Sequence, residues 1–286
     1  MTTLGKRVGT YFLRPILVVA AGALLLATPG TAKAYPTTAV FTPTGEALDG
    51  GAVCVFAYSS TNFAPRLSPG AWWLGSQVGV IPQFQYGKGL RFGGLELGFD
   101  VISPFGNNIV KPVLNAKVGL ITEGTVSPAI ALGIMEVSPA LPAMNLIYLS
   151  VTKTLRMGEG PSFGRLTLAF GYAAGARAQF NGTFPFYDTH VALMAAYETP
   201  EIAQRLGFVI DHFGGTSEVS NTYMGATLHL LAATKLAAGA FIASERSEPA
   251  TTYDGFFASI MVNFDALELF GASRAKADAR PMTGAR

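Results

Sequence analysis

The clearest pattern of hydrophobic and polar positions runs from Arg91 to Glu123. It consists of two segments in which apolar residues occupy every second position, with the polar turn 103–108 between them. Pairing across this turn would place Lys117 on the same face as Glu96 and Asp100, between them. The opposite face is apolar and comprises Leu95, Leu97, Phe99, Val101, Leu114, Ala116, Val118 and Leu120.

The same alternation recurs along the chain in segments of about ten residues, separated by turn residues. After the first 34 residues, no apolar run is long enough to cross a membrane as a helix. Short connections at 124–126 and 233–234 contrast with longer ones at 61–71, 176–187 and 245–253. The pattern predicts an all-β fold, a transmembrane antiparallel up-and-down β-barrel of about twelve strands. The predicted strands are 51–60, 72–81, 90–102, 112–123, 127–137, 144–156, 164–175, 188–198, 205–214, 222–232, 235–244 and 254–264.

An exported soluble β-sandwich is the alternative fold, because its strands also alternate. The outward face of a sandwich would need charge, whereas the second face here is mostly glycine, alanine and threonine. Only 13% of the residues are charged and the mean hydropathy is +0.36. Both values favour the barrel over the sandwich.

The ends of the chain differ in composition from its body. Residues 1–34 are typical of a secretory signal peptide, with a basic start, a short apolar run and small residues at Ala32 and Ala34. We expect 35–50 to be a periplasmic segment and 51–264 to form the barrel. The remaining residues, 265–286, are rich in alanine and basic residues and are expected to be disordered.

With these strands identified, the chain resembles bacterial outer-membrane β-barrel proteins. The resemblance covers Gly51 to Phe264 and is one of class. It implies a location in the outer membrane of a Gram-negative bacterium, with membrane lipid as a partner. The chain departs from the class in one respect, because a tail follows Phe264 where such barrels usually end on an aromatic residue.

Charged residues at inward-facing positions are the candidate functional residues. Glu96, Asp100 and Lys117 would form a charge cluster in the lumen, either selecting solutes or serving as a structural ion network. Arg156 and Arg165 flank a turn, where they would line the mouth of a pore or remain solvated.

Other chemistry finds little support. The net charge of +2 does not suggest a nucleic-acid partner, and the single cysteine, Cys54, excludes an internal disulfide. Three dispersed histidines, His190, His212 and His229, have no metal-ligand spacing. Ser162 lies in a Gly-x-Ser-x-Gly match that leads into a strand rather than a strand-to-helix elbow, so a catalytic role is not expected.

The sequence therefore predicts a passive outer-membrane channel or transporter for small, weakly polar or hydrophobic solutes, without a cofactor and without enzymatic activity. The hydrophobic preference follows from apolar residues at inward positions, among them Met135, Met194 and Phe257. A structural or surface-interaction barrel with a plugged lumen is the first alternative, and a barrel-embedded hydrolase is the second.

Overall fold

The computed structural model describes residues 38–62, 68–86, 90–103, 110–138, 145–158, 160–173, 191–203, 205–214, 221–231, 233–243 and 254–266. Within these ranges the protein is built from strands. They are β1 (Ala52–Asn62), β2 (Ser68–Ile81), β3 (Phe84–Tyr86), β4 (Leu90–Phe92), β5 (Gly94–Ser103), β6 (Lys111–Ile121), β7 (Ala129–Val137), β8 (Leu146–Arg156), β9 (Ser162–Ala173), β10 (Val191–Glu198), β11 (Leu206–Phe213), β12 (Asn221–Leu231), β13 (Thr234–Ala243) and β14 (Gly255–Asp265).

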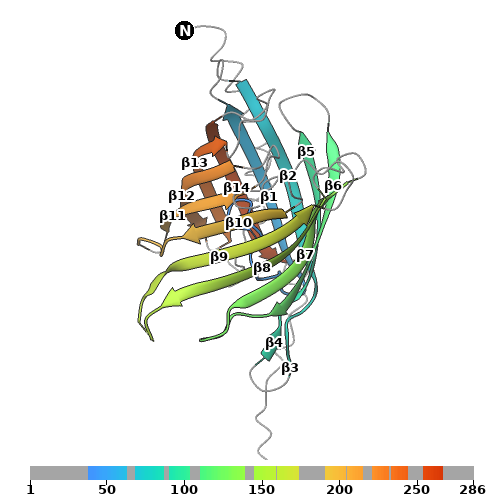
Figure 1. The fold of residues 1–286 in the computed structure, drawn as a ribbon, viewed down its shortest axis with the longest axis vertical. Helices are drawn as coiled ribbons and strands as arrows, with labels where there is room; N and C mark the ends of the chain where they lie inside the picture. The colour runs from blue at the N-terminus through green and yellow to red at the C-terminus, as the bar shows by residue number, and fades with distance from the viewer. Residues whose placement is uncertain are drawn as a thin grey trace, which may run out of the picture.

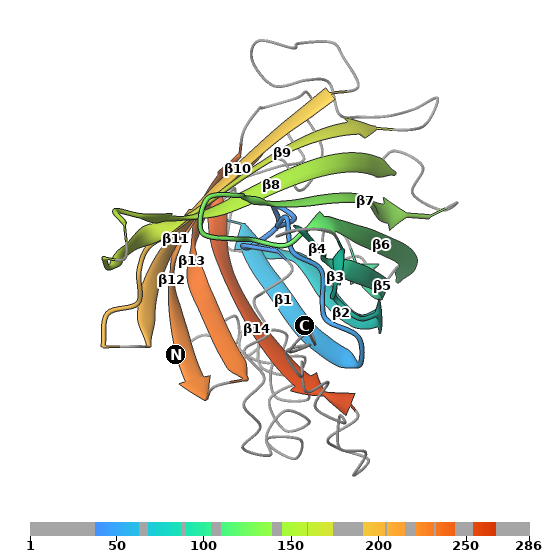
Figure 2. The ribbon, with the colours of Figure 1, turned by 90° about the horizontal axis from the view of Figure 1, so that it is seen from below.

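Twelve of the described strands form one closed antiparallel barrel (Figures 1 and 2). The ring closes where β1 pairs with β14, from Ala52 opposite Asp265 to Asn62 opposite Gly255. The other two, β3 and β4, form a small hairpin between β2 and β5 that extends below the barrel in Figure 1. No helix in the described ranges is long and apolar enough to span a membrane. The predicted fold class and strand number are confirmed.

One predicted strand, 90–102, is wrong in detail because the structure divides it into β4 and β5. The break falls at Gly93 and Gly94, and Gly94 has a φ of 95°, a conformation that side chains other than glycine rarely adopt. A Cβ at Gly93 would lie 2.8 Å from the Cα of Gly119, so the chain passes close to β6 at this point. After the break, β4 pairs with β3, while the Arg91 carbonyl still accepts the N–H of Thr122 just after β6 at 2.9 Å.

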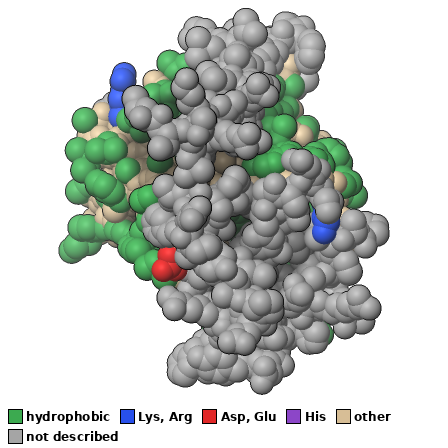
Figure 3. All heavy atoms as spheres, turned by 90° about the horizontal axis from the view of Figure 1, so that it is seen from above, with side chains coloured by type: hydrophobic (Ala, Val, Ile, Leu, Met, Phe, Trp, Pro, Cys, Tyr) green, Lys and Arg blue, Asp and Glu red, His purple; other side chains and the backbone are tan. Residues whose placement is uncertain are grey.

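The outward positions of the strands carry large apolar side chains that are exposed on the outer surface of the barrel. On β6, β9 and β11, the exposed fractions of Leu114, Leu168 and Ile210 are 56%, 53% and 50%. In the described part of the surface, hydrophobic side chains cover the flanks while charged side chains are few (Figure 3). An apolar belt around a closed antiparallel sheet is the surface of a barrel that spans a membrane.

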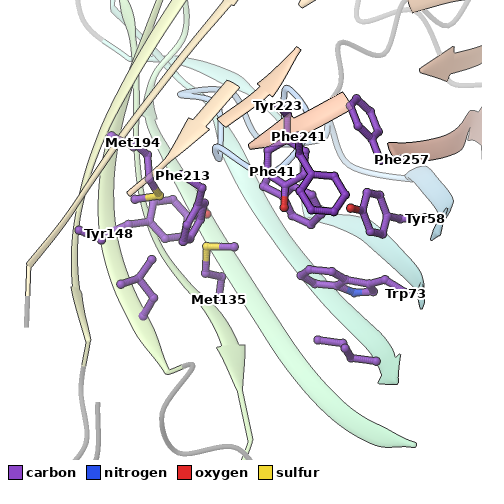
Figure 4. Packing of buried hydrophobic residues seen from close by; sticks show 14 of the residues in the cluster. Phe41, Tyr58, Trp73, Met135, Tyr148, Met194, Phe213, Tyr223, Phe241 and Phe257 are labelled. Atoms are coloured by element: carbon purple, nitrogen blue, oxygen red, sulfur yellow. The ribbon is translucent and has the colours of Figure 1, made fainter. Parts of the chain in front are cut away.

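The inward positions are packed. One cluster of buried aromatic and aliphatic residues fills the interior, with members on strands from opposite sides of the ring (Figure 4). The glycines on this face make room for neighbouring side chains. A Cβ at Gly133 would lie 2.4 Å from the Tyr148 hydroxyl oxygen, and one at Gly171 would lie 2.8 Å from Leu146.

Candidate functional site in the barrel lumen

A stretch of chain before β1 occupies the lumen. We call residues 38–49 the inner segment. It makes hydrogen bonds to the side chains of Asp211 on β11, Thr152 on β8 and Glu96 on β5, three strands spaced around the ring. Residues 35–50 were expected to be periplasmic, yet the structure places 38–49 inside the barrel. The predicted signal peptide and the tail beyond residue 266 lie outside the described residues.

Asp211 holds the first part of the inner segment. Its Oδ2 accepts hydrogen bonds from the backbone N–H groups of Val40, Phe41 and Thr42, at 2.7, 2.7 and 3.0 Å. Its Oδ1 accepts a fourth from the Thr42 hydroxyl at 2.5 Å. A tight turn, in which the Ala39 N–H donates to the Thr42 carbonyl at 3.0 Å, aims these groups at one carboxylate. Asp211 is fully buried, so this carboxylate is stabilised by hydrogen bonds in place of water.

Further contacts fix the rest of the inner segment. The Gly45 N–H donates to Thr152 Oγ1 at 2.8 Å, and Ser150 Oγ donates to the Thr44 carbonyl at 2.9 Å. A Cβ at Gly45 would lie 2.4 Å from the Ala129 carbonyl oxygen, so only glycine allows this approach to the wall. The inner segment is thus attached to the wall mainly from backbone to side chain.

The three residues of the predicted charge cluster contact different partners. Lys117 Nζ lies 3.5 Å from Glu96 Oε2, with both side chains almost fully buried, as the register of β5 and β6 dictates. The same Glu96 oxygen accepts the Leu48 N–H at 2.9 Å, which ties this ion pair to the inner segment. Asp100 instead accepts a hydrogen bond from the Asn115 side-chain amide at 2.5 Å.

Asn115 sits at a β-bulge that shapes this corner of the lumen. The register of β6 and β7 shifts between Leu114 and Ala116. Asn115 Oδ1 accepts the Glu136 N–H at 2.8 Å, and Glu136 has a φ of 58°, a strained conformation for a non-glycine residue. The bulge therefore turns Asn115 towards Asp100.

The two arginines predicted at a pore mouth do not lie together. Arg156 is exposed at the end of β8. Arg165 is buried and pairs with Glu46 of the inner segment and with Glu198, whose Oε2 lies 3.6 Å away. Lys235 extends this chain of charges with a contact of 2.6 Å to Glu198. The wall near Arg165 thus provides a second charged attachment for the inner segment.

An aromatic group surrounds the tip of the inner segment. The Phe41 ring lies 4.9 Å from Tyr58, 5.5 Å from Trp73 and 4.8 Å from Tyr223, measured between ring centres (Figure 4). Trp73 points into the lumen and is buried. Such ring pairs contribute about 0.5–1.5 kcal/mol each beyond the burial of area.

Between the inner segment and the wall lies a cavity of about 70 Å³, the lumen cavity. Its apolar lining includes Phe41, Phe56, Trp73, Met135 and Tyr148. Its polar lining includes Gln77, Glu96, Asp100, Asn115 and Lys117. The predicted lumen residues thus meet in one cavity, together with an inner segment that the sequence did not predict.

The residues considered for catalysis and metal binding have local partners. Ser162 Oγ accepts the Gly164 N–H at 3.1 Å within its own turn. His212 Nδ1 lies 2.9 Å from the Thr222 hydroxyl, and His229 Nε2 lies 3.3 Å from Glu201. His190 lies outside the described residues. In the described part of the chain, no group of three histidine, cysteine, aspartate or glutamate residues could hold a metal ion.

No protein-family model and no curated protein matches this chain. Among solved structures, it is similar to a triple mutant of the porin from Rhodopseudomonas blastica, with 7% identity, a TM-score of 0.32, and coverage of 74% of this chain and 99% of that chain. It is also similar to OprB from Pseudomonas putida at low pH, with 10% identity, a TM-score of 0.27, and coverage of 74% and 91%. The chain resembles the bacterial outer-membrane β-barrels as a class, and its own closed sheet and apolar belt carry that assignment.

Proposed function

We propose that this protein is an outer-membrane channel for small, weakly polar or hydrophobic solutes, and that the inner segment keeps it closed at rest. The observation that carries the proposal is the lumen cavity, which lies inside a closed barrel between the wall and the inner segment. The membrane in question is the outer membrane of a Gram-negative bacterium, as the barrel class implies.

The lining of the lumen supports the choice of solute. The aromatic and thioether side chains of Phe41, Trp73 and Met135 offer apolar contacts, while the charged groups nearby are already paired or hydrogen-bonded. A sugar would need many free hydrogen-bonding groups, which this lining does not supply. A small solute with a largely apolar surface fits it better.

The attachment of the inner segment supports closure by a movable element. Its contacts with Asp211 and Thr152 are hydrogen bonds to side chains, and water can replace such bonds once the segment leaves. Motions of a loop of this size are much faster than unfolding of a barrel. A structural barrel with a permanent plug is the second candidate, and the number of polar contacts to the segment favours it.

Planar-bilayer recordings distinguish the two candidates. The wild-type protein should show rare, short conductance steps, and Asp211→Ala should show more frequent and longer ones because four bonds to the inner segment are lost. Cyclopentanol should interrupt the open current, whereas glucose at the same concentration should not.

Three results would contradict the proposal. Large, continuous conductance of the wild-type protein would show that the lumen is open at rest. Silence of both proteins would favour the structural barrel. Interruption by glucose as effective as that by cyclopentanol would refute the preference for weakly polar solutes.

A further inference from the structure

Four charged side chains meet where the inner segment passes β9, β10 and β13. Arg165 on β9 is 9% exposed and contacts two carboxylates, Glu46 of the inner segment and Glu198 on β10. Lys235 on β13 is 8% exposed and contacts Glu198 at 2.6 Å. We call Arg165, Glu198 and Lys235 the wall triad. With Glu46 in place, two negative charges among these four residues balance two positive ones.

Release of the inner segment changes this balance. Glu46 leaves with the segment, whereas the three residues of the wall triad belong to strands of the barrel. One carboxylate then faces two cations. The charged neighbour His229, opposite Lys235 on β12, contributes no imbalance because it has its own acid, Glu201, at 3.3 Å. A poorly solvated cation that loses its counter-charge is costly, so the place left by Glu46 favours an anion.

We propose that the wall triad is a binding site for a small aliphatic monocarboxylate, which takes the place of the Glu46 carboxylate and thereby favours release of the inner segment. Glu46 shows the chemistry that the site accepts, because its side chain ends in such a group. A planar carboxylate can accept two parallel hydrogen bonds from a guanidinium group, and its single negative charge restores the balance. The inference adds an effector to the proposed function and rests on that function for the passage of solute after release.

Other solutes fit the wall triad less well. A dianion such as sulfate turns an excess of one positive charge into an excess of one negative charge beside Glu198. Chloride supplies the charge but lacks the pair of oxygens that matches the Arg165 guanidinium. A neutral amide has the shape of a carboxylate but not its charge. A monocarboxylate supplies both.

An apolar patch beside the wall triad explains the preference for an aliphatic chain. Val209 on β11 lies opposite Glu198, and Ala196 lies two residues before Glu198 on the same inward face of β10. Both are buried, and they form one cluster with Ala39 and Val40 of the inner segment. When the segment leaves, this patch loses its cover next to the cations. A short hydrocarbon chain attached to the carboxylate can replace that cover.

The site can be filled from solution once the Glu46 carboxylate is removed. Glu46→Ala deletes one CH₂ group and the carboxylate, which correspond to acetate. At neutral pH and constant ionic strength, acetate in place of chloride should raise the urea midpoint of Glu46→Ala in liposomes, whereas acetamide should not. Formate needs less room and should act in the same way. Glu46→Gln is the matched control, because its amide fills the space and acetate should leave its midpoint unchanged.

In the wild-type protein, the same anions should release the inner segment. Chymotrypsin can cleave after Phe41 only when this residue leaves the interior, where it is 5% exposed. An anion that binds only the released form should raise the cleavage rate about tenfold at ten times its Kd. Butyrate should reach this effect at a concentration about tenfold lower than acetate, because its longer chain covers the apolar patch. In Arg165→Met, the ratio of the rates with and without acetate should fall to about one.

Each result bears on the site separately from conduction. Failure of both acetate and formate to stabilise Glu46→Ala, or an equal effect on Glu46→Gln, overturns the site. A wild-type cleavage rate that acetate does not change, a response that survives in Arg165→Met, or equal potency of acetate and butyrate also overturns the proposal. If Glu46→Ala does not assemble, the cleavage experiment alone decides. Binding and release as expected, combined with silent bilayers, keep the site and refute the channel, whereas conductance without any response to acetate keeps the channel and refutes the site.

Discussion

The contact between Asp211 and the inner segment can be tested by removing the carboxylate. Asp211→Ala eliminates four hydrogen bonds to a charged acceptor, three from consecutive backbone N–H groups and one from the Thr42 hydroxyl. A hydrogen bond to a charged group contributes about 1.5–3 kcal/mol, but water will satisfy part of what is lost and the buried carboxylate no longer has to be desolvated. We therefore expect the free energy that favours the attached inner segment over the released one to fall by about 3–5 kcal/mol.

The isosteric variant should give an intermediate effect. In Asp211→Asn, the amide oxygen has two lone pairs for three N–H donors, and its NH₂ group can face the Thr42 hydroxyl. We expect a loss of about 1–2 kcal/mol for this variant.

Cleavage by chymotrypsin after Phe41 reports the opening directly, because this residue is 5% exposed while the segment is in place. When opening and closing are fast, the cleavage rate follows the population of the open state. The rate should rise on the order of 100- to 4000-fold in Asp211→Ala, which is the loss of about 3–5 kcal/mol expressed as a ratio of populations. Glu123→Ala is the control, because it removes a carboxylate that contacts Lys153 and Thr154. Chymotrypsin should cleave this variant at the wild-type rate. Equal rates for Asp211→Ala and wild type would refute the role of Asp211.

The remaining predictions use urea unfolding in liposomes and thiol labelling. Lys117→Met should lower the free energy of unfolding by about 3–5 kcal/mol because it leaves Glu96 buried without its cation. Adding Glu96→Gln should recover much of this loss. A double variant as unstable as the sum of the two single variants would contradict the pairing. Leu168→Arg should lower the free energy of unfolding by about 2–4 kcal/mol because the side chain faces lipid. An unchanged stability would mean that residue 168 does not face lipid. Gly75→Ala should destabilise the barrel because the new Cβ would lie 2.2 Å from a carboxylate oxygen. A stability equal to that of the wild type would contradict this close approach. Cys54 is fully buried, so a maleimide should label it only after unfolding, and rapid labelling of folded protein would contradict the structure.

The strands were predictable because each one separates two different environments. Leu168 and Phe170 meet lipid, while Thr167 and Ala169 on the same strand meet the packed interior, so the sequence alternates wherever the barrel wall is continuous. The pairing of Glu96 with Lys117 was also predictable, because β5 and β6 are consecutive strands and the alternation of each fixes which residues face the interior.

The inner segment was not predictable by the same logic. It has no period of two or of 3.6 residues, and its bonds to Asp211 join positions 169 to 171 residues apart in the chain. One signal was present, since Asp211 is an acidic residue at an inward position of β11. The role of Arg165 was missed for the same reason. It was expected at a pore mouth, but it pairs with Glu46 of the inner segment, which the sequence pattern did not place in the lumen.

The inward glycines make room for large side chains of neighbouring strands. Gly75 is covered by Asp100 and Phe56, and Gly133 is covered by Tyr148. Small residues in one strand thus accommodate large side chains from the next, which keeps the lumen filled. Sequence alone does not reveal which neighbour takes the space.

The way the inner segment is held favours a closure that can be reversed. A segment that had joined the sheet would share regular backbone hydrogen bonds with two strands and could leave only by opening the barrel. Here the contacts run mainly from backbone N–H groups to the side chains of Asp211, Thr152 and Glu96, and Glu46 adds an ion pair with Arg165. Water can replace such contacts without the unpairing of two strands. The pairing of the wall does not depend on the inner segment, because β1 is closed against β14. In the proposed gate, the contacts that hold the inner segment are therefore separate from the strand pairing that holds the barrel together, which is the arrangement a gate requires.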